Sequence, residues 1–536
     1  MKTTCLVLAF IVAAQLALAQ SRTYYISANG NDANSGRSPR AAWLTLDRVN
    51  RAAFHPGDAI LFRSGDMWWG QLHPQGSGAD GKPIRIDRYG KGPLPVINFG
   101  EAMGAGLKLS NQEWWQICNL EITSGAPPEP GQGRAGIAVL AEGPGSHTGH
   151  IVIGNCYFHD IWGQLGGTGT FTGYSSAGIY VGPLMGRGRT NAPSADCILV
   201  ESNRIERVDR CGIIVVRAHT NIVVRGNVME DLGGDGIMMS GCVRGLMEHN
   251  IARRTCMSTG DTNVVMAAGR YNPHSAAMWI QNCTDTVMQY NEVYDTGRQR
   301  GNGDGEAYDF DFYCTNCVAQ FNYSRNNHGL LLIMDKAVRN IARYNISEND
   351  QSHLIEMHGT VAEGNLINNN VFYVDYGMAD ITFYMGMTNI DDTARSLMGA
   401  NFRNNIFYAT GQGRFRTVFT HGSALERQYL EAVKLPTPEP GTLFEHNWYF
   451  GPWLNGLPDD PEKMEGDPMF VAPGSGGVGL ATLAGYRLRD NSPCIRTGMT
   501  VENNGQRDFY GNSLNPGAVS CGVFEKPEAG GAHLKR

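Results

Sequence analysis

The chain has 536 residues, of which 68 are Gly and 18 % are charged. Glycine at about 13 % exceeds the usual ~7 %, and the charged share lies below the usual ~25 %, so the composition disfavours a helical protein and excludes a disordered one. The net charge of −7 argues against a surface that binds nucleic acid through its phosphates. We therefore expect a large β-rich globular protein with no nucleic-acid partner.

Residues 1–19 predict a secretory signal peptide. Lys2 precedes an apolar run over residues 5–18, and residues 17–19 read Ala-Leu-Ala, a cleavage site before Gln20. No later apolar stretch reaches the ~18–20 residues of a membrane span, and no Cys follows the cleavage site to carry a lipid. These features predict a secreted or periplasmic protein without a membrane span.

Residues 20–84 are expected to form an N-terminal cap and the first strands. Apolar side chains recur at helical spacing at Trp43, Leu46, Val49 and Ala53. The spacing predicts a helix over 43–53 that closes the open apolar end of the repeats that follow.

Residues 85–450 carry a repeat built on an Asn beside a short run of β-forming residues, and the tightest copies lie 23 to 25 residues apart. The Val-, Ile- and Met-rich runs in each unit have strand length, not helix length. The recurring Asn residues are Asn119, Asn203, Asn227, Asn250, Asn291, Asn322, Asn345, Asn370 and Asn405.

A unit of this length cannot bury its own apolar face, but stacked units can bury a continuous core. The repeat therefore predicts an all-β, single-stranded right-handed parallel β-helix, a solenoid. We expect the Asn residues to stack at one corner in the left-handed backbone region and to hydrogen-bond to one another. A leucine-rich repeat would need a Leu frame that is missing here, and a β-propeller would need longer units.

Past residue 450 the repeat fades. Residues 451–527 are predicted to form C-terminal strands and a cap, with short strands at 486–488 and 522–524, and residues 528–536 a tail. Cys494 and Cys521 flank this region and are candidates for a disulfide in an oxidising compartment. The only Cys-x-x-Cys, Cys314 with Cys317, has no partner pair at zinc spacing, so we predict no metal site there or elsewhere.

Several turn and cap motifs carry a resemblance. Residues 24–32 read Tyr-Tyr-Ile-Ser-Ala-Asn-Gly-Asn-Asp, residues 56–58 Pro-Gly-Asp, and residues 467–470 Asp-Pro-Met-Phe. Together with the repeat they resemble the secreted right-handed parallel β-helix carbohydrate-active enzymes of the pectate-lyase-like superfamily, which are glycoside hydrolases or polysaccharide lyases. The resemblance spans nearly the whole mature chain, and it implies a polysaccharide or oligosaccharide substrate.

The densest group of carboxylates lies in residues 303–312. Strand alternation places Asp309 and Asp311 on one face, with Phe310 and Phe312 on the other. Two like charges this close raise at least one pKa and can supply an acid and a base. Asp304 and Glu306 stand beside them, and the alternative interpretation is a Ca²⁺ site.

Asp235, in a Gly-Gly-Asp-Gly turn, is a further candidate, although an Asp beside Gly is a common turn former. The resemblance adds that related enzymes often carry stretches like residues 304–311 and a turn like that of Asp235.

The predicted catalytic residues are thus Asp309, Asp311, Asp304, Glu306 and Asp235. The predicted substrate-binding residues are Trp279, His274, His328, Lys336 and Arg217.

Residues 352–358 alternate, so we expect His353 on the face of Ile355 and Glu356 with His358 on the other. This segment has no placed Ser or Cys for a nucleophilic triad and is weak evidence for a site.

The paired carboxylates favour a glycoside hydrolase with no cofactor, working in a lateral groove of the solenoid. One alternative is a polysaccharide lyase that neutralises a uronate, with Ca²⁺ as an optional cofactor, and removes the α-proton with a base. A non-catalytic carbohydrate-binding or adhesive solenoid is the third class.

Overall fold

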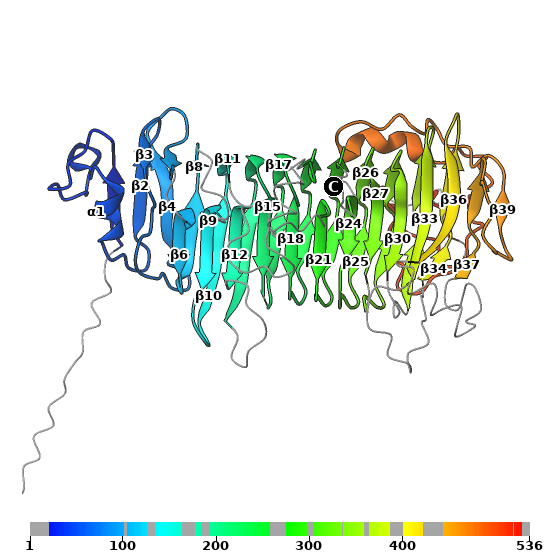
Figure 1. The fold of residues 1–536 in the computed structure, drawn as a ribbon, viewed down its shortest axis with the longest axis horizontal. Helices are drawn as coiled ribbons and strands as arrows, with labels where there is room; N and C mark the ends of the chain where they lie inside the picture. Colours follow the sequence, from blue (N-terminus) through cyan, green and yellow to red (C-terminus); the bar gives the residue numbers. More distant parts are fainter. Residues whose placement is uncertain are drawn as a thin grey trace, which may run out of the picture.

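The structure is a computed structural model, and it describes residues 21–100, 104–125, 134–162, 177–183, 193–217, 219–257, 275–297, 304–334, 336–358, 364–385, 400–421, 443–517 and 519–527. Strands stack side by side along the long axis of the molecule, from α1 at one end to β39 at the other (Figure 1). The signal peptide and tail predicted at 1–19 and 528–536 lie outside the described residues.

The described strands form three sheets. The first has 14 strands, in the order β1 (Thr23–Ile26), β2 (Ala59–Arg63), β4 (Ile84–Tyr89), β7 (Glu113–Cys118), β10 (His147–Gly154), β13 (Ser194–Glu201), β16 (Ile222–Arg225), β19 (Leu246–Glu248), β22 (Val287–Gln289), β25 (Val318–Gln320), β28 (Ile341–Arg343), β31 (Asn365–Asn368), β34 (Ala400–Arg403) and β37 (Leu443–Glu445).

The second sheet also has 14 strands, in the order β3 (Met67–Trp69), β5 (Val96–Asn98), β8 (Glu121–Thr123), β11 (Tyr157–Ile161), β14 (Arg204–Val208), β17 (Val228–Leu232), β20 (Ile251–Arg253), β23 (Glu292–Tyr294), β26 (Tyr323–Arg325), β29 (Ile346–Glu348), β32 (Val371–Val374), β35 (Ile406–Ala409), β38 (Trp448–Phe450) and β39 (Met464–Glu465).

The third sheet has 11 strands, in the order β6 (Gly104–Ser110), β9 (Arg134–Ala141), β12 (Ala177–Pro183), β15 (Cys211–Val216), β18 (Ile237–Ser240), β21 (Met278–Gln281), β24 (Glu306–Phe310), β27 (Gly329–Ile333), β30 (Ser352–His358), β33 (Met378–Met385) and β36 (Arg414–His421).

From the coil of β4 to the coil of β36, each coil contributes one strand to each sheet, and neighbouring strands pair in parallel, as in β14 with β17 and β24 with β27. One apolar core runs inside the coils from Ile26 to Tyr449. The prediction of an all-β right-handed parallel β-helix is therefore confirmed. Stacking begins with β1 and β2, inside the segment predicted to hold the cap and first strands.

From Asn203 onward, the recurring Asn residues form a continuous hydrogen-bonded column, which we call the Asn ladder. Asn119 lies outside it, and its amide donates to Oδ1 of Asp87 at 2.8 Å. Nδ2 of Asn227 donates to Oδ1 of Asn250 at 3.0 Å, and the backbone N–H of Asn227 reaches the same oxygen at 3.0 Å. The pattern repeats from Asn203 to Asn447, and Asp460 accepts the last bonds.

The predicted stacking is confirmed for the ladder Asn residues, but their predicted left-handed backbone is wrong. Asn119, outside the ladder, does take a positive φ of 58°. The residue before each ladder Asn takes the positive φ, as at Gly226 (63°), His249 (54°) and Tyr344 (51°). The turn is therefore made one residue earlier, which leaves each Asn free to face its neighbours in the stack.

The cap helix is shorter than predicted. α1 covers Leu46–Asn50, because Thr45 caps it by accepting a hydrogen bond from the N–H of Arg48. Trp43 instead pairs with Ile26 as a bridge. Leu46 and Val49 are buried in the end of the core, as the cap prediction requires. A 3₁₀ turn, η1 (Pro39–Ala41), precedes it.

The C-terminal segment runs back along the outside of the second sheet, where η2 (Leu480–Tyr486) lies above the later coils (Figure 1). Tyr486 donates to Glu348 on β29 at 2.6 Å, and Glu292 on β23 accepts from Gly479 at 2.8 Å. The strands predicted at 486–488 and 522–524 are wrong, because this segment packs on side chains of the sheet instead of extending it.

The eleven Cys residues among the described positions are free thiols, including Cys494 and Cys521, so the predicted disulfide is absent there. Cys314 and Cys317 are buried in the core, in line with a packing role. In the described parts of the chain, no helix is long and apolar enough to span a membrane.

Candidate active site

The carboxylate cluster, which we define as Asp304, Glu306, Asp309 and Asp311, is centred on β24 in the third sheet. Asp309 pairs in register with Trp279 on β21 and Leu332 on β27. Its two neighbours in the chain belong to the core. Asp309 therefore points out of the solenoid, as strand alternation predicts.

The third sheet has a repeated irregularity that widens this outer face. On four successive coils, two consecutive residues both pack in the core, and the register shifts at this place between β30 and β33. The pairs are Ala277 with Met278, Ala307 with Tyr308, Leu330 with Leu331, and Leu354 with Ile355. Residues three apart, such as Glu306 and Asp309, can consequently both lie outside the core.

This irregularity corrects the expectation for His353. Simple alternation placed His353 on the face of Ile355 and away from Glu356, which is wrong. Nδ1 of His353 contacts Oε2 of Glu356, and Nε2 of His358 contacts Oε1 of the same carboxylate. Glu356 is thus held between two imidazoles on the outer face of β30.

Gly329 provides the space in which Glu306 meets this group. It pairs with Glu306 in the sheet, and a Cβ at Gly329 would lie 2.9 Å from Cγ of Glu306 and 1.9 Å from the carbonyl oxygen of His353. Ligand atoms of Glu306, His353 and Glu356 all lie within 4.8 Å of one another, a set that is able to hold a metal ion.

Asp309 is a buried carboxyl with a raised pKa. Burial, followed by the charges of Asp311, Asp304 and Glu306, raises the pKa of Asp309 well above its ordinary value. Its Oδ1 is shielded from solvent and has no hydrogen-bond partner among the described residues. This environment favours the protonated form of Asp309.

Asp311 has the opposite environment. Its Oδ1 accepts a hydrogen bond from the backbone N–H of Phe312 at 2.6 Å, and its Oδ2 accepts one from Nε2 of Gln281 at 2.8 Å. Two donors stabilise the negative charge of a carboxylate. Asp309 and Asp311 therefore sit side by side in environments that favour different protonation states.

Asp304 is the most exposed of the four carboxylates, being half-buried where Glu306, Asp309 and Asp311 are buried. The loop beside it is fixed by Thr296, whose hydroxyl donates to the carbonyl of Gly305 at 2.7 Å. Asp304 is thus the member that solvent reaches most easily.

Asp235 lies in the same sheet, where its charge acts on Asp309. It forms a buried ion pair with Arg210, Nη2 to Oδ2 3.1 Å, and accepts a hydrogen bond from the thiol of Cys211 at 3.0 Å. Because Asp235 is held by these contacts, we interpret it as a structural support of the outer face and not as a group that attacks the substrate.

Of the predicted substrate-binding residues, Trp279 and His328 lie beside the carboxylate cluster. Trp279 neighbours Asp309, and its indole nitrogen has no hydrogen-bond partner within the described ranges. The His328 ring lies 4.9 Å from that of His353, centroid to centroid.

The remaining three predicted binding residues lie elsewhere. Lys336 is exposed and contacts Tyr313, with Nζ 3.4 Å from the hydroxyl. Arg217 follows β15, three strands from β24. His274 lies outside the described residues.

Sequence reasoning left out His353, Glu356, His358 and Gln281 as site residues. The signal was present for the first three, since an ionisable residue at every second or third position of an apolar strand is unusual. What the sequence did not reveal was the irregularity that brings His353 and Glu356 to the same face.

The fold and this outer face define a right-handed parallel β-helix with an acid- and histidine-rich site. No family model matches the chain. It is 26 % identical, over 587 aligned positions, to a lacto-N-biosidase from Bifidobacterium longum subsp. longum, an alignment that covers 93 % of this chain and 34 % of that protein. The chain thus spans about a third of the length of this curated relative.

Two solved structures agree with the fold. The GH136 lacto-N-biosidase from Eubacterium ramulus superposes with a TM-score of 0.55 at 22 % identity, covering 74 % of this chain and 67 % of that chain. XylC in complex with xylose gives a TM-score of 0.50 at 11 % identity, covering 94 % and 98 % of the two chains.

Proposed function

We propose that this chain is a glycoside hydrolase that cleaves an oligosaccharide or polysaccharide on the outer face of the third sheet. The observation that carries the proposal is the pairing of a buried Asp309, whose pKa is raised, with a hydrogen-bonded Asp311. Glycosidases need one carboxyl that gives a proton to the leaving oxygen and one carboxylate that attacks or activates water. The likeness to a lacto-N-biosidase over most of the chain supports the same class.

In this mechanism Asp311 is the charged carboxylate, because Gln281 and the Phe312 N–H hold its oxygens and fix their direction. Either Asp304 or Asp309 donates the proton to the leaving oxygen. The raised pKa of Asp309 favours its protonated form. Asp304 is the carboxyl best placed to meet substrate, because it is the most exposed.

Glu306 and Asp235 act indirectly. Their negative charges help to keep Asp309 protonated. The contacts of Glu356 with His353 and His358 fix the wall of the site on the next coils. We place Trp279 and His328 at its rim as substrate-binding residues, with Lys336, Arg217 and His274 as more distant candidates.

The signal-peptide pattern at residues 1–19 supports a secreted or periplasmic enzyme that meets its glycan outside the cytoplasm.

The test is incubation of the purified protein with a panel of neutral and acidic glycans, a lacto-N-bioside among them. New reducing ends without the ultraviolet absorbance of an unsaturated uronate support the hydrolase. Both signals together would indicate a lyase, and the absence of both would leave a carbohydrate-binding solenoid.

A further inference from the structure

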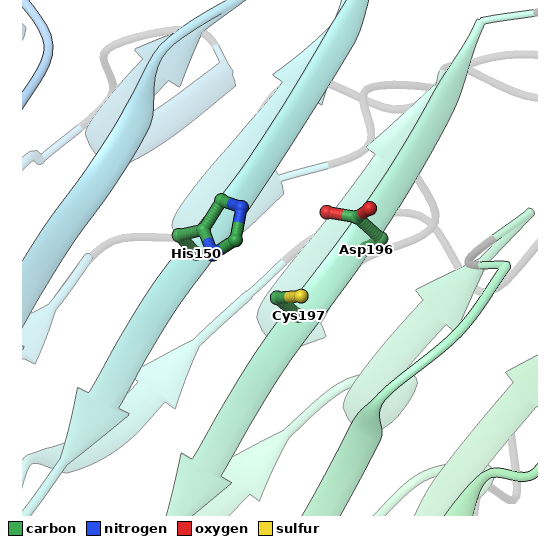
Figure 2. Close-up of side chains that lie close together, drawn as sticks. All are labelled: His150, Asp196 and Cys197. Atoms are coloured by element: carbon green, nitrogen blue, oxygen red, sulfur yellow. The ribbon is translucent and has the colours of Figure 1, made fainter. Parts of the chain in front are cut away.

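A second cluster of ionisable side chains lies on the first sheet, on different strands from the carboxylate cluster. His150 on β10 and Cys197 on β13 occupy the same position on successive coils, between the pairs Gly149–Asp196 and Ile151–Ile198. Both have positive φ, 55° and 49°. Figure 2 shows His150 on one strand and Asp196 with Cys197 on the neighbouring one.

The three side chains are close enough to share one ion. One ligand atom each from His150, Asp196 and Cys197 lies within 4.8 Å of the other two. Ligands bound to zinc at ~2.0–2.3 Å stand roughly 3.3–3.8 Å apart in a tetrahedron, so small side-chain rotations suffice.

His147 lies beside Asp196, outside the group of three, and is the candidate for a fourth ligand. Its Nε2 lies 3.3 Å from Oδ1 of Asp196, and its Nδ1 lies 3.1 Å from the hydroxyl of Ser194. A ring nitrogen that donates to a neighbour leaves the other with its lone pair free for a metal, which is the usual arrangement of a metal-bound histidine. Ser194 thus orients Nε2 of His147 toward the cluster.

The surroundings also fit a built site. A Cβ at Gly149 would lie 2.5 Å from Oδ1 of Asp196, so only glycine leaves room for this carboxylate between the two histidines. Oδ1 of Asp196 is shielded from solvent and accepts no hydrogen bond from any described residue, and Nε2 of His147 lies 3.3 Å from it. A buried carboxylate oxygen without a donor is costly, and a cation would remove that cost.

Two further residues hold the ligands in place. The indole of Trp114 stacks on the His150 ring, with centroids 3.6 Å apart and planes 3° from parallel. Nδ2 of Asn221 donates to the sulfur of Cys197 at 3.6 Å, a contact that stabilises a thiolate. Both come from the adjoining coils, β7 and the turn before β16.

We propose that His147, His150, Asp196 and Cys197 form a zinc site that ties β10 to β13. The mixture of imidazole nitrogens, one carboxylate and one thiolate suits Zn²⁺, whereas Ca²⁺ and Mg²⁺ prefer oxygen ligands alone. The site is independent of the proposed glycosidase and departs from the sequence-based prediction of no metal site. The sequence hid it because its ligands come from two coils and follow no Cys-x-x-Cys spacing.

The experiment is calorimetric titration of the metal-stripped full chain with Zn²⁺, beside Cys197→Ser, His150→Asn and the control Cys118→Ser. Asn suits the positive φ of position 150, as it does at Asn221. Cys118 lies on the same sheet outside the cluster and is likewise half-buried. Circular dichroism checks that each variant folds.

We expect one Zn²⁺ per chain in the wild type and in Cys118→Ser, and affinity at least about 10–100-fold weaker in the two site variants. Titration with Co²⁺ should give a thiolate-to-metal charge-transfer band that Cys197→Ser lacks. The proposal is overturned if the wild type binds no Zn²⁺. A further variant, His353→Gln, tests the group of Glu306, His353 and Glu356. The proposal is also overturned if Cys197→Ser and His150→Asn bind Zn²⁺ as tightly as the wild type. Weaker binding by His353→Gln would then place the ion in that other group.

Discussion

The Asn ladder, a column through many coils, and the carboxylate cluster, on one coil, both bring polar side chains together at mostly buried positions, yet their hydrogen bonding differs. In the ladder each Asn amide donates to the next Asn oxygen, as Asn322 does to Asn345 at 3.0 Å. In the cluster Asp309 lies among like charges, and its Oδ1 has no donor within the described ranges. A buried polar group that is paired stabilises the fold, whereas one that is unpaired costs stability and marks a place for chemistry.

The largest expected effect comes from the cluster. Asp309→Asn and Asp311→Asn should each lower kcat/KM by about 10²–10⁴, the usual share of an acid–base group. The thermal midpoint should stay or rise, because Asp311→Asn removes a like charge and Asp309→Asn removes a buried carboxyl whose Oδ1 has no hydrogen-bond donor among the described residues. Asp304→Asn, measured beside them, tells whether the exposed carboxyl or the buried one gives the proton.

The matched control is Asp350→Asn. Asp350 is also a buried carboxyl, and burial raises its pKa to about 7, but its Oδ1 accepts from the N–H of Asn327 at 2.8 Å. An amide oxygen can keep that bond, so activity should be retained. Full activity in both Asp309→Asn and Asp311→Asn would remove these residues from the mechanism.

The next effect comes from the ladder. Asn322→Ala leaves the amide of Asn291 and a backbone N–H without their acceptor, and should reduce the free energy of unfolding by about 1–3 kcal/mol. The control is Asn401→Ala, at a half-buried position outside the ladder, which should change it by less than about 0.5 kcal/mol. Chemical denaturation measures both, and kcat should be unchanged in both. Equal stability of the two variants would contradict a structural role for the ladder.

The third effect is a pH dependence of stability. The pKa of Asp309 is higher in the folded chain than its ordinary value near 3.8, so the folded state binds more protons than the unfolded one. This contribution is fully present below pH 3.8 and is lost as the pH rises through the raised pKa, by up to about 1.4 kcal/mol per pH unit. Asp350, with a pKa of about 7, and Asp508, with about 6, add to the same slope.

Denaturation of the wild type and of Asp309→Asn at several pH values tests this directly. The variant should lose less stability than the wild type as the pH rises. Parallel curves would mean that Asp309 titrates alike in the folded and unfolded chain.

The sequence was sufficient for the ladder and the solenoid, because a 23–25-residue repeat of Asn beside short apolar runs reflects contacts between neighbouring coils. It also indicated the carboxylates, since Asp309 stands between the core residues Tyr308 and Phe310, although Asp311 lies past the end of β24 beside the half-buried Phe312. Three features could not be predicted from the sequence, because each depends on contacts between residues far apart in the chain or on an irregular strand. They are the irregularity that turns His353 toward Glu356, the return of the C-terminal segment over the second sheet, and the meeting of His150 with Cys197 across two coils.

The most direct test of a glycosidase on this face is digestion in water enriched in ¹⁸O, using the glycan that the panel selects, with the wild type and Asp311→Asn side by side. Hydrolysis places one oxygen of water on the new reducing end, so the wild-type product should gain one ¹⁸O by mass spectrometry and the variant should form almost none of it. An unsaturated product without ¹⁸O, or equal labelled product from both proteins, would contradict the proposed role of the carboxylate cluster.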